Sequence, residues 1–273
     1  MSTWVIARST FGEAIRKRIG LYILFTAVIF IILSQLFASL SVSGSVASQG
    51  TQGAASGSVE VTVIKSMAFG IIVLGGLVLA IFLSFDLVPS DMDKKTIYTI
   101  LSKPVHRYQY ILGKYLGTAM ALGVNLGFMG VALLALVFIK TGFLQWPILA
   151  GILMFLLQFS VLAGLAILLS LVVSRNITVA LCFAFYIMGM VSEFWQSIAT
   201  TTPSKGIQLL AQFMHYAIPN FYNFQWTSSL VHMEQWREIP NPGVDLGLTT
   251  LYGLLWITGL MVLASSIFSR KEV

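Results

Sequence analysis

The sequence is poor in cysteine and in charge, and each shortage excludes a class of protein. Cys182 is the single cysteine among 273 residues, which excludes a disulfide framework and a cysteine-rich metal site. Acidic and basic residues together make up only 10% of the chain, against about 25% in an ordinary soluble domain. Hydrophobic residues instead account for 57%, and the mean hydropathy is +0.88. This balance excludes a soluble globular domain and a disordered chain, and it predicts an integral membrane protein.

Motifs for nucleotide binding, hydrolysis and metal binding are also missing. Gly113-Lys114 lacks both the glycine five residues earlier and the following Ser or Thr of a phosphate-binding loop, so we expect no ATP site in this chain. No H-E-x-x-H or G-x-S-x-G sequence occurs, which argues against a hydrolase. The residues that could bind copper form two adjacent pairs, Met214–His215 and His232–Met233. Neighbours in a helix do not share a face, so we expect no metal site.

Six apolar runs are long enough to cross a membrane. A span needs about 20 mostly apolar residues, and backbone groups in lipid must be satisfied within the segment, which favours helices. We therefore expect an all-α polytopic membrane protein in which residues 1–273 form one transmembrane domain. The predicted spans are 19–40, 67–85, 115–139, 147–173, 177–198 and 246–268.

The lysines and arginines divide unequally between the two sides of these spans. Six spans place both termini on one side, which carries twelve of these residues against four on the other. Cytoplasmic loops carry the excess of positive charge, so we expect both termini in the cytoplasm and the chain in the inner (plasma) membrane. Topology thereby accounts for the sequence pI of about 9.5, and no nucleic-acid partner is expected.

Three segments outside the spans have patterns of their own. Residues 1–18 contain an amphipathic stretch, which predicts an interfacial helix in contact with membrane lipid. Residues 41–58 are uncharged and rich in Ser, Gly, Ala and Gln, which predicts a flexible external loop. Residues 199–245 form a long external segment that we expect to enter the outer membrane surface or to cover the bundle. Its apolar helical stripe is Ile207, Leu210, Ala211 and Met214.

The connection between spans two and three predicts a short cytoplasmic helix over about 91–103. Ser90 is placed to cap its start, and Pro104 stops it. Ile97 and Leu101 share one face although neither lies in a span. An exposed apolar face on a charged helix indicates docking to a partner, and a solvated connector is the alternative.

Polar residues within the predicted spans are costly, so they mark either bonds between helices or a substrate path. Both interpretations stay open from the sequence. Two Gly-x-x-x-Gly pairs, which begin at Gly113 and Gly123, allow helices to approach closely. The candidate substrate-path residues are Asn125, Gln158 and Glu193.

Three stretches resemble the type-2 ABC exporter permeases, particularly the group of the nitrous oxide reductase maturation permease. Residues 93–105 (DKKTIYTILSKPV) and 110–117 (YILGKYLG) carry most of the resemblance. Residues 218–221 (IPNF), after span five, are also similar to that family. Family members usually have Glu near Asp91 or Asp93, so the acidic pair here is a shorter variant.

The resemblance implies the permease of an ABC exporter, paired with itself or a sister permease and bound to two cytoplasmic ATPase subunits. These subunits would bind ATP and Mg²⁺, and the 91–103 helix would be the coupling helix seated on them. A scaffold for maturation of a periplasmic metalloenzyme stays open as an alternative. A secondary transporter is another, although it predicts charges at mid-depth in the membrane. The candidate ATPase-coupling residues are Asp91, Asp93, Lys94, Thr96, Ile97 and Leu101.

Overall fold

The computed structural model is helical apart from short turns in the residues that it describes. These residues are 2–16, 18–49, 54–93, 107–201, 205–225 and 242–270. No strand occurs within these ranges, which confirms the all-α prediction. The helices are α1 (Ser2–Arg16), α2 (Arg18–Gln49), α3 (Ala54–Ser84), α4 (Leu87–Asp93), α6 (Arg107–Thr141), α7 (Trp146–Val172), α8 (Arg175–Met190), α9 (Ser192–Thr201), α10 (Lys205–Ala217), the 3-10 turn η1 (Tyr222–Phe224) and α13 (Pro242–Arg270).

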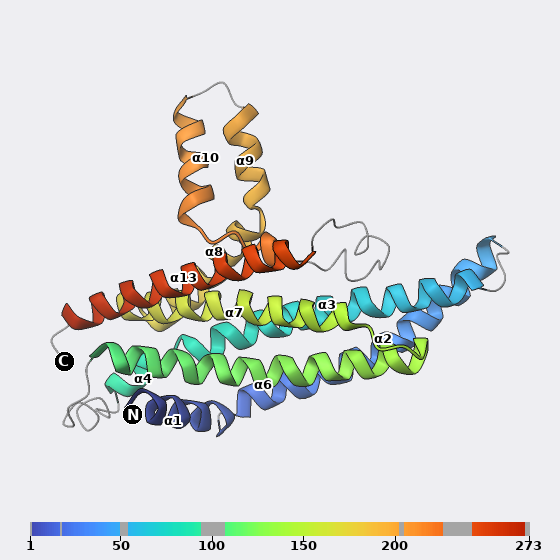
Figure 1. Ribbon diagram of the computed structural model, residues 1–273, viewed down its shortest axis with the longest axis horizontal. Helices are drawn as coiled ribbons and strands as arrows, with labels where there is room; N and C mark the ends of the chain where they lie inside the picture. Colours follow the sequence, from blue (N-terminus) through green and yellow to red (C-terminus); the bar gives the residue numbers. More distant parts are fainter. Residues whose placement is uncertain are drawn as a thin grey trace.

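The long helices α2, α3, α6, α7 and α13 form one elongated bundle around α7 (Figure 1). The sequence of α7 is apolar on all sides, as is typical of a helix enclosed by others, and it packs against α3, α6 and α13. Phe155 and Phe159 of α7 are fully buried. Gly76 of α3 makes room for the Phe159 ring, because a Cβ atom at Gly76 would lie 2.2 Å from it.

The described residues contain several helices that are long and apolar enough to cross a membrane, as expected of a multi-pass protein. Two bent helix pairs, Thr3–Arg16 with Gly20–Gln35 (59°) and Arg175–Met190 with Ser192–Thr201 (57°), raise the number of spans to six if each pair crosses once. The four unbroken spans are Glu60–Asp91, Arg107–Thr141, Trp146–Val172 and Gly243–Arg270.

The segment predicted to be a flexible external loop is helical where the structure describes it. α2 continues to Gln49 and α3 begins at Ala54, so the prediction of a flexible loop over 41–58 is wrong for 41–49 and 54–58. Extending an existing helix adds a hydrogen bond for each residue without a new nucleation cost. The Ser- and Ala-rich tract therefore continues the helices of the two spans that it joins.

The fifth predicted span bends where α8 ends. A straight helix would place the Glu193 N–H on the Gly189 carbonyl, but this carbonyl accepts a hydrogen bond from the Phe221 N–H at 3.2 Å. Gly189 also allows the returning chain to approach, because a Cβ atom there would lie 2.4 Å from the Pro219 carbonyl oxygen. The loss of the helical hydrogen bond explains the 57° angle between α8 and α9.

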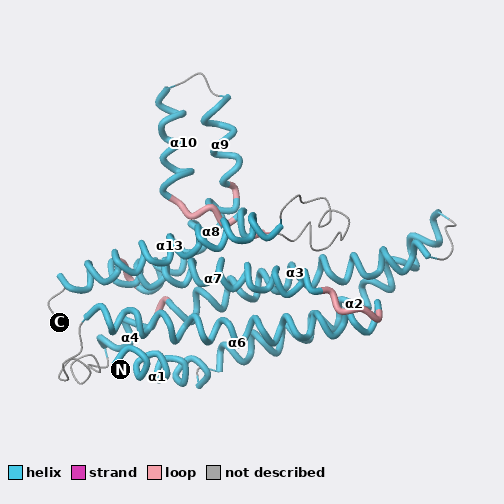
Figure 2. Tube along the Cα trace, viewed as in Figure 1, coloured by secondary structure: helices cyan, strands magenta, loops and turns pink. Residues whose placement is uncertain are grey.

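Helices α9 and α10 pack against each other and stand away from the bundle (Figures 1 and 2). The predicted apolar stripe is helical, but α10 does not cover the bundle: it stands away from it, and Ile207 and Leu210 are exposed whereas Ala211 is buried. A contact of 3.0 Å between Ser192 Oγ and His215 Nδ1 holds the two helices together at the base of the hairpin. Among the described residues, the hairpin therefore meets the bundle at its base.

Helix α1 packs along the first half of α6 through the first of the two glycine pairs. A Cβ atom at Gly117 would lie 2.6 Å from the Ala7 carbonyl oxygen, and one at Gly113 would lie 2.8 Å from the Ile6 side chain. Gly127, in the second pair, has no such neighbour within 4 Å. The sequence motif therefore marks a close helix approach at one position and not at the other.

Gly117→Ala should displace α1 from α6. The added methyl group meets backbone, which cannot move aside as a side chain can, so we expect a loss of about 1–3 kcal/mol in stability. The matched control is Gly127→Ala on the same helix, which should be neutral or slightly stabilising because alanine favours a helix. The aggregation temperature of the purified variants measures the difference, and equal temperatures would show that α1 does not depend on this contact.

Candidate coupling site

Helix α4 is the last described element before residues 94–106, in which most of the ATPase contact is predicted. The helix begins at Leu87 and not at 91, and the Ser90 N–H donates to the Asp86 carbonyl at 3.0 Å. Ser90 therefore lies inside the helix, and its predicted capping role is wrong. The remaining predicted coupling residues lie outside the described residues; they are Lys94, Thr96, Ile97 and Leu101.

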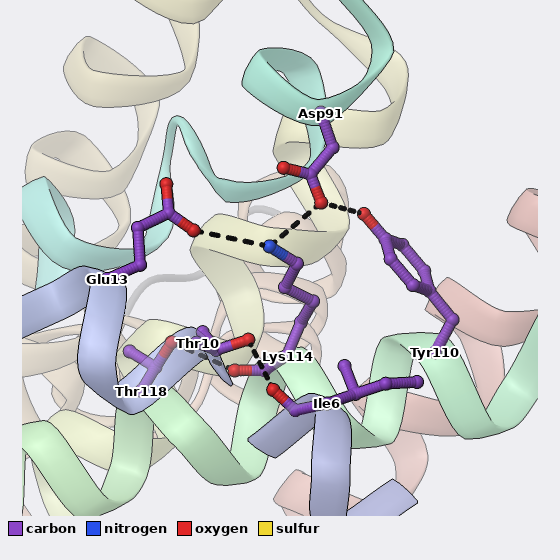
Figure 3. Close-up of polar contacts among 7 residues, drawn as sticks. All are labelled: Ile6, Thr10, Glu13, Asp91, Tyr110, Lys114 and Thr118. Atoms are coloured by element: carbon purple, nitrogen blue, oxygen red, sulfur yellow. Dashed lines mark hydrogen bonds and ion pairs between the residues drawn. The ribbon is translucent and has the colours of Figure 1, made fainter. Parts of the chain in front are cut away.

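Asp91 of α4 points into the protein and meets Lys114 of α6 (Figure 3). Its Oδ2 atom lies 2.8 Å from Lys114 Nζ and accepts a hydrogen bond of 2.7 Å from the Tyr110 hydroxyl. Glu13 of α1 approaches the same ammonium group, with 3.6 Å between Oε2 and Nζ. Lys114 is 4% exposed and Asp91 7% exposed, so this is a buried ion pair with a second carboxylate beside it.

The local structure of α6 explains why these groups meet. Tyr110 and Lys114 are four residues apart on one helix and therefore lie on the same face. A buried charge needs a partner and further hydrogen bonds, which Asp91 receives from both side chains. The cluster joins three segments that are distant in sequence, namely the end of α1, the end of α4 and the start of α6.

A second set of ion pairs holds the other side of α4. Arg175, the first residue of α8, places its Nε atom 3.2 Å from Asp86 Oδ1, and its Nη2 atom contacts Asp93 Oδ2. Arg175 and Asp93 are exposed, so each of these pairs is worth only about 0–1 kcal/mol. The Arg175 pairs orient α4 relative to α8, whereas the buried pair at Lys114 fixes its position.

The start of α6 also binds the end of α13. Tyr110 stacks on Phe268 with 5.5 Å between the ring centroids. Arg107 Nη1 donates to the Ser269 carbonyl at 3.0 Å. A cation is favourable at this position because the carboxyl end of a helix carries a partial negative charge. The ends of α4 and α13 and the beginnings of α6 and α8 therefore form one connected structure.

The two acidic residues predicted to touch the ATPase also bind to their own chain. Asp91 is held by α6 and Asp93 by α8, so both link the segment that follows them to the bundle. The sequence interpretation did not identify Lys114, Tyr110, Glu13 or Arg175 as site residues. A signal was present for Lys114, because a lysine directly before the apolar run 115–139 needs an acidic partner or a route to water.

The three candidate substrate-path residues are not brought together. The Asn125 amide donates to the Ala121 carbonyl of its own helix at 2.8 Å. Gln158 is fully buried, and its Nε2 atom donates to the Tyr186 hydroxyl at 3.5 Å, which joins α7 to α8. Glu193 is exposed on α9, outside the bundle. These positions favour bonds within and between helices for Asn125 and Gln158.

Potential metal ligands do not gather in the part of the chain that the structure describes. No group of three or more His, Cys, Asp or Glu side chains is arranged there to hold a metal ion. Met214 and His215 lie on α10, and His215 contacts Ser192. The other pair of candidate copper ligands, His232 and Met233, lies outside the described residues.

Comparison with known proteins places the chain in a family of transporters. The family model described as "ABC-2 family transporter protein" matches residues 4–273, which is nearly the whole chain. No curated protein matches the sequence. The matched range includes α1, the coupling site and the α9–α10 hairpin.

Proposed function

Since the chain belongs to the ABC-2 transporter family, we propose that it is the permease of an ABC exporter driven by a separate ATPase subunit. The family supplies the membrane component of such transporters, and the sequence has no phosphate-binding loop. Hydrolysis must then take place in another chain. The substrate enters and leaves through a bundle that switches between two arrangements.

The anchoring of α4 is the observation that carries the coupling part of this proposal. A force applied by an ATPase to residues 94–106 acts directly on α4, which precedes them. The buried pair at Lys114 transfers the movement to α6 and, through Glu13, to α1. Arg175 transfers it to α8. A rigid link of this kind is needed because a loosely attached segment would move without changing the bundle.

The assembly that we propose contains two permeases and two ATPase subunits. The second permease is another copy or a sister chain, and the exposed apolar side chains of the α9–α10 hairpin provide a surface for it. Native mass spectrometry of the purified complex counts the subunits. The narrower similarity to the nitrous oxide reductase maturation permease rests on residues 93–105, 110–117 and 218–221, and it leaves the transported substrate unidentified.

ATP hydrolysis should require the partner subunit. The chain purified alone is expected to show no hydrolysis and no tight ATP binding, because it lacks a phosphate-binding loop. Reconstitution with the ATPase that co-purifies from its native membrane should give hydrolysis that vanadate inhibits. Robust hydrolysis by the single purified chain would contradict the proposed division of labour.

The proposed topology can be tested with single cysteines in a Cys182→Ala background. Ser48→Cys should be labelled from outside and Ser102→Cys from the cytoplasm, because the excess of lysine and arginine lies on the side of the termini. A membrane-impermeant thiol reagent added to intact cells and to inverted vesicles measures the two accessibilities. Labelling of both positions from the same side would refute the six-span topology.

A further inference from the structure

A groove runs between α6 and α13, with α7 as its floor. Its main part has a volume of about 700 Å³, and the lining from these helices includes Leu116, Leu157 and Leu254. A second hollow of about 320 Å³ continues it, and the two share Leu112, Thr258 and Met261. We propose that this groove binds one acyl chain of a phospholipid whose headgroup lies at its cytoplasmic end.

The main part of the groove suits hydrocarbon and little else. Three of the five hydroxyl groups that line it are already bonded to carbonyl oxygens of their own helices. Ser160 donates to Leu156 at 2.6 Å and Thr250 to Leu246 at 2.7 Å. Thr258 does the same, with 2.9 Å to the Leu255 carbonyl. Apart from Thr3 and Tyr115, the remaining lining is apolar and carries no hydrogen-bonding side chain, so most polar groups of a ligand would lose their hydrogen bonds to water without replacement there.

The continuation of the groove has a different chemistry. Tyr108, Ser265 and Ser266 line it, at the start of α6 and near the end of α13. Arg107 Nη1 lies 3.0 Å from the Ser269 carbonyl oxygen, one turn beyond Ser265, and Arg270 ends α13, so both arginines stand at this end of the groove although neither lines the hollow itself. The Ser266 hydroxyl donates to the Val262 carbonyl at 2.9 Å, so a phosphate would be bound by the two arginines together with the Ser265 hydroxyl. The apolar part next to them is suited to the acyl chain.

The dimensions also favour a single chain. The stretch of α13 from Thr250 to Ser266 rises about 24 Å, which exceeds half of the hydrocarbon core of about 30 Å. The two hollows, of about 700 Å³ and 320 Å³, follow each other along this stretch and leave room for a narrow flexible chain.

Apolar contact alone does not select a lipid here. Lipid tails are as apolar as leucine, so entering the groove gains little over remaining in the bilayer. Selection has to come from the polar end and from the fit of the groove. The proposal therefore predicts a defined orientation of the bound lipid, which surrounding bulk lipid does not have.

Two photoactivatable phosphatidylglycerols test this orientation in lipid nanodiscs. One carries a diazirine at the end of an acyl chain, and the other carries it next to the glycerol. After irradiation, peptide mapping should place the first label around Leu157 and Leu254, and the second around Tyr108 and Ser266. Even labelling of all exposed apolar faces, or the same pattern from both probes, would overturn the proposal.

A blocking variant gives a second measurement. Ala119→Phe fills the groove from α6 and should remove most of the labelling of α13, whereas Val131→Phe, on an exposed part of the same helix, should leave it unchanged. Leu116→Cys in a Cys182→Ala background tests the other occupant. Disulfide-linked dimers would show that a second copy covers this face, which would also overturn the proposal. None of these measurements needs ATP or a transported substrate, so they are independent of the proposed function.

Discussion

Lys114→Met is expected to destabilise the folded chain by about 3–5 kcal/mol, because it leaves Asp91 buried without a cation. Methionine retains the length of the side chain, so the loss reports the charge and not a cavity. The Tyr110 hydroxyl still donates to Asp91, but it cannot neutralise the carboxylate. The aggregation temperature of the purified protein measures the effect, which should appear as a clear decrease.

Two variants give this experiment its controls. Lys140→Met, also on α6, removes a partly exposed ion pair with Glu60 of α3, in which Nζ and Oε1 are 2.6 Å apart. This change should cost only about 0–1 kcal/mol. The double variant Lys114→Met with Asp91→Leu replaces the buried pair by apolar side chains and should regain most of the stability. If Lys114→Met were as stable as Lys140→Met, the pair would not hold α4 in place.

The double variant Ile97→Ser with Leu101→Ser should lose at least about a hundredfold in affinity for the ATPase. Burying these two side chains in a partner contributes about 3–6 kcal/mol together, whereas each exposed ion pair contributes about 0–1 kcal/mol. Apolar contact should therefore hold the complex, and charges should orient it. The six spans should insert normally, since neither residue lies in one.

The measurement is co-purification of the ATPase at equal membrane levels of each variant. Phe143→Ser with Leu144→Ser is a suitable control, because it removes two exposed apolar side chains at the opposite end of α6. This control should bind the ATPase as the wild type does. Undiminished binding by the Ile97 and Leu101 variant would mean that the segment is a solvated connector.

The sequence was sufficient for features that depend on local composition. Hydropathy alone locates the long helices, because a span must be apolar over its whole length. The amphipathic stretch within residues 1–18 also predicts that α1 is helical, since amphipathic periodicity is a local property. Gly113 and Gly117 were identified as a site of close approach, but the motif could not show that the partner is α1.

Features that depend on distant residues were not predictable in the same way. The sequence could not show that Asp91 and Glu13 converge on Lys114, because a one-dimensional pattern does not bring distant segments together. The bend after Gly189 depends on Phe221, which lies 32 residues later, in a segment that reads as a loop. Ser90 failed as a cap because α4 starts at Leu87 in continuation of α3, where Asp86 already supplies the carbonyl.

The close fit of α1 against α6 determines the order in which the chain can be assembled. Gly117 is synthesised about a hundred residues after Thr10, which is roughly 5–20 s at common translation rates. During that interval the first two spans leave the ribosome while α1 has no protein surface to pack against. Its apolar face can be sheltered meanwhile by the lipid headgroup region, for which an amphipathic helix is suited. We therefore expect the same amphipathic pattern to serve first at the membrane surface during biogenesis and later at the contact with α6.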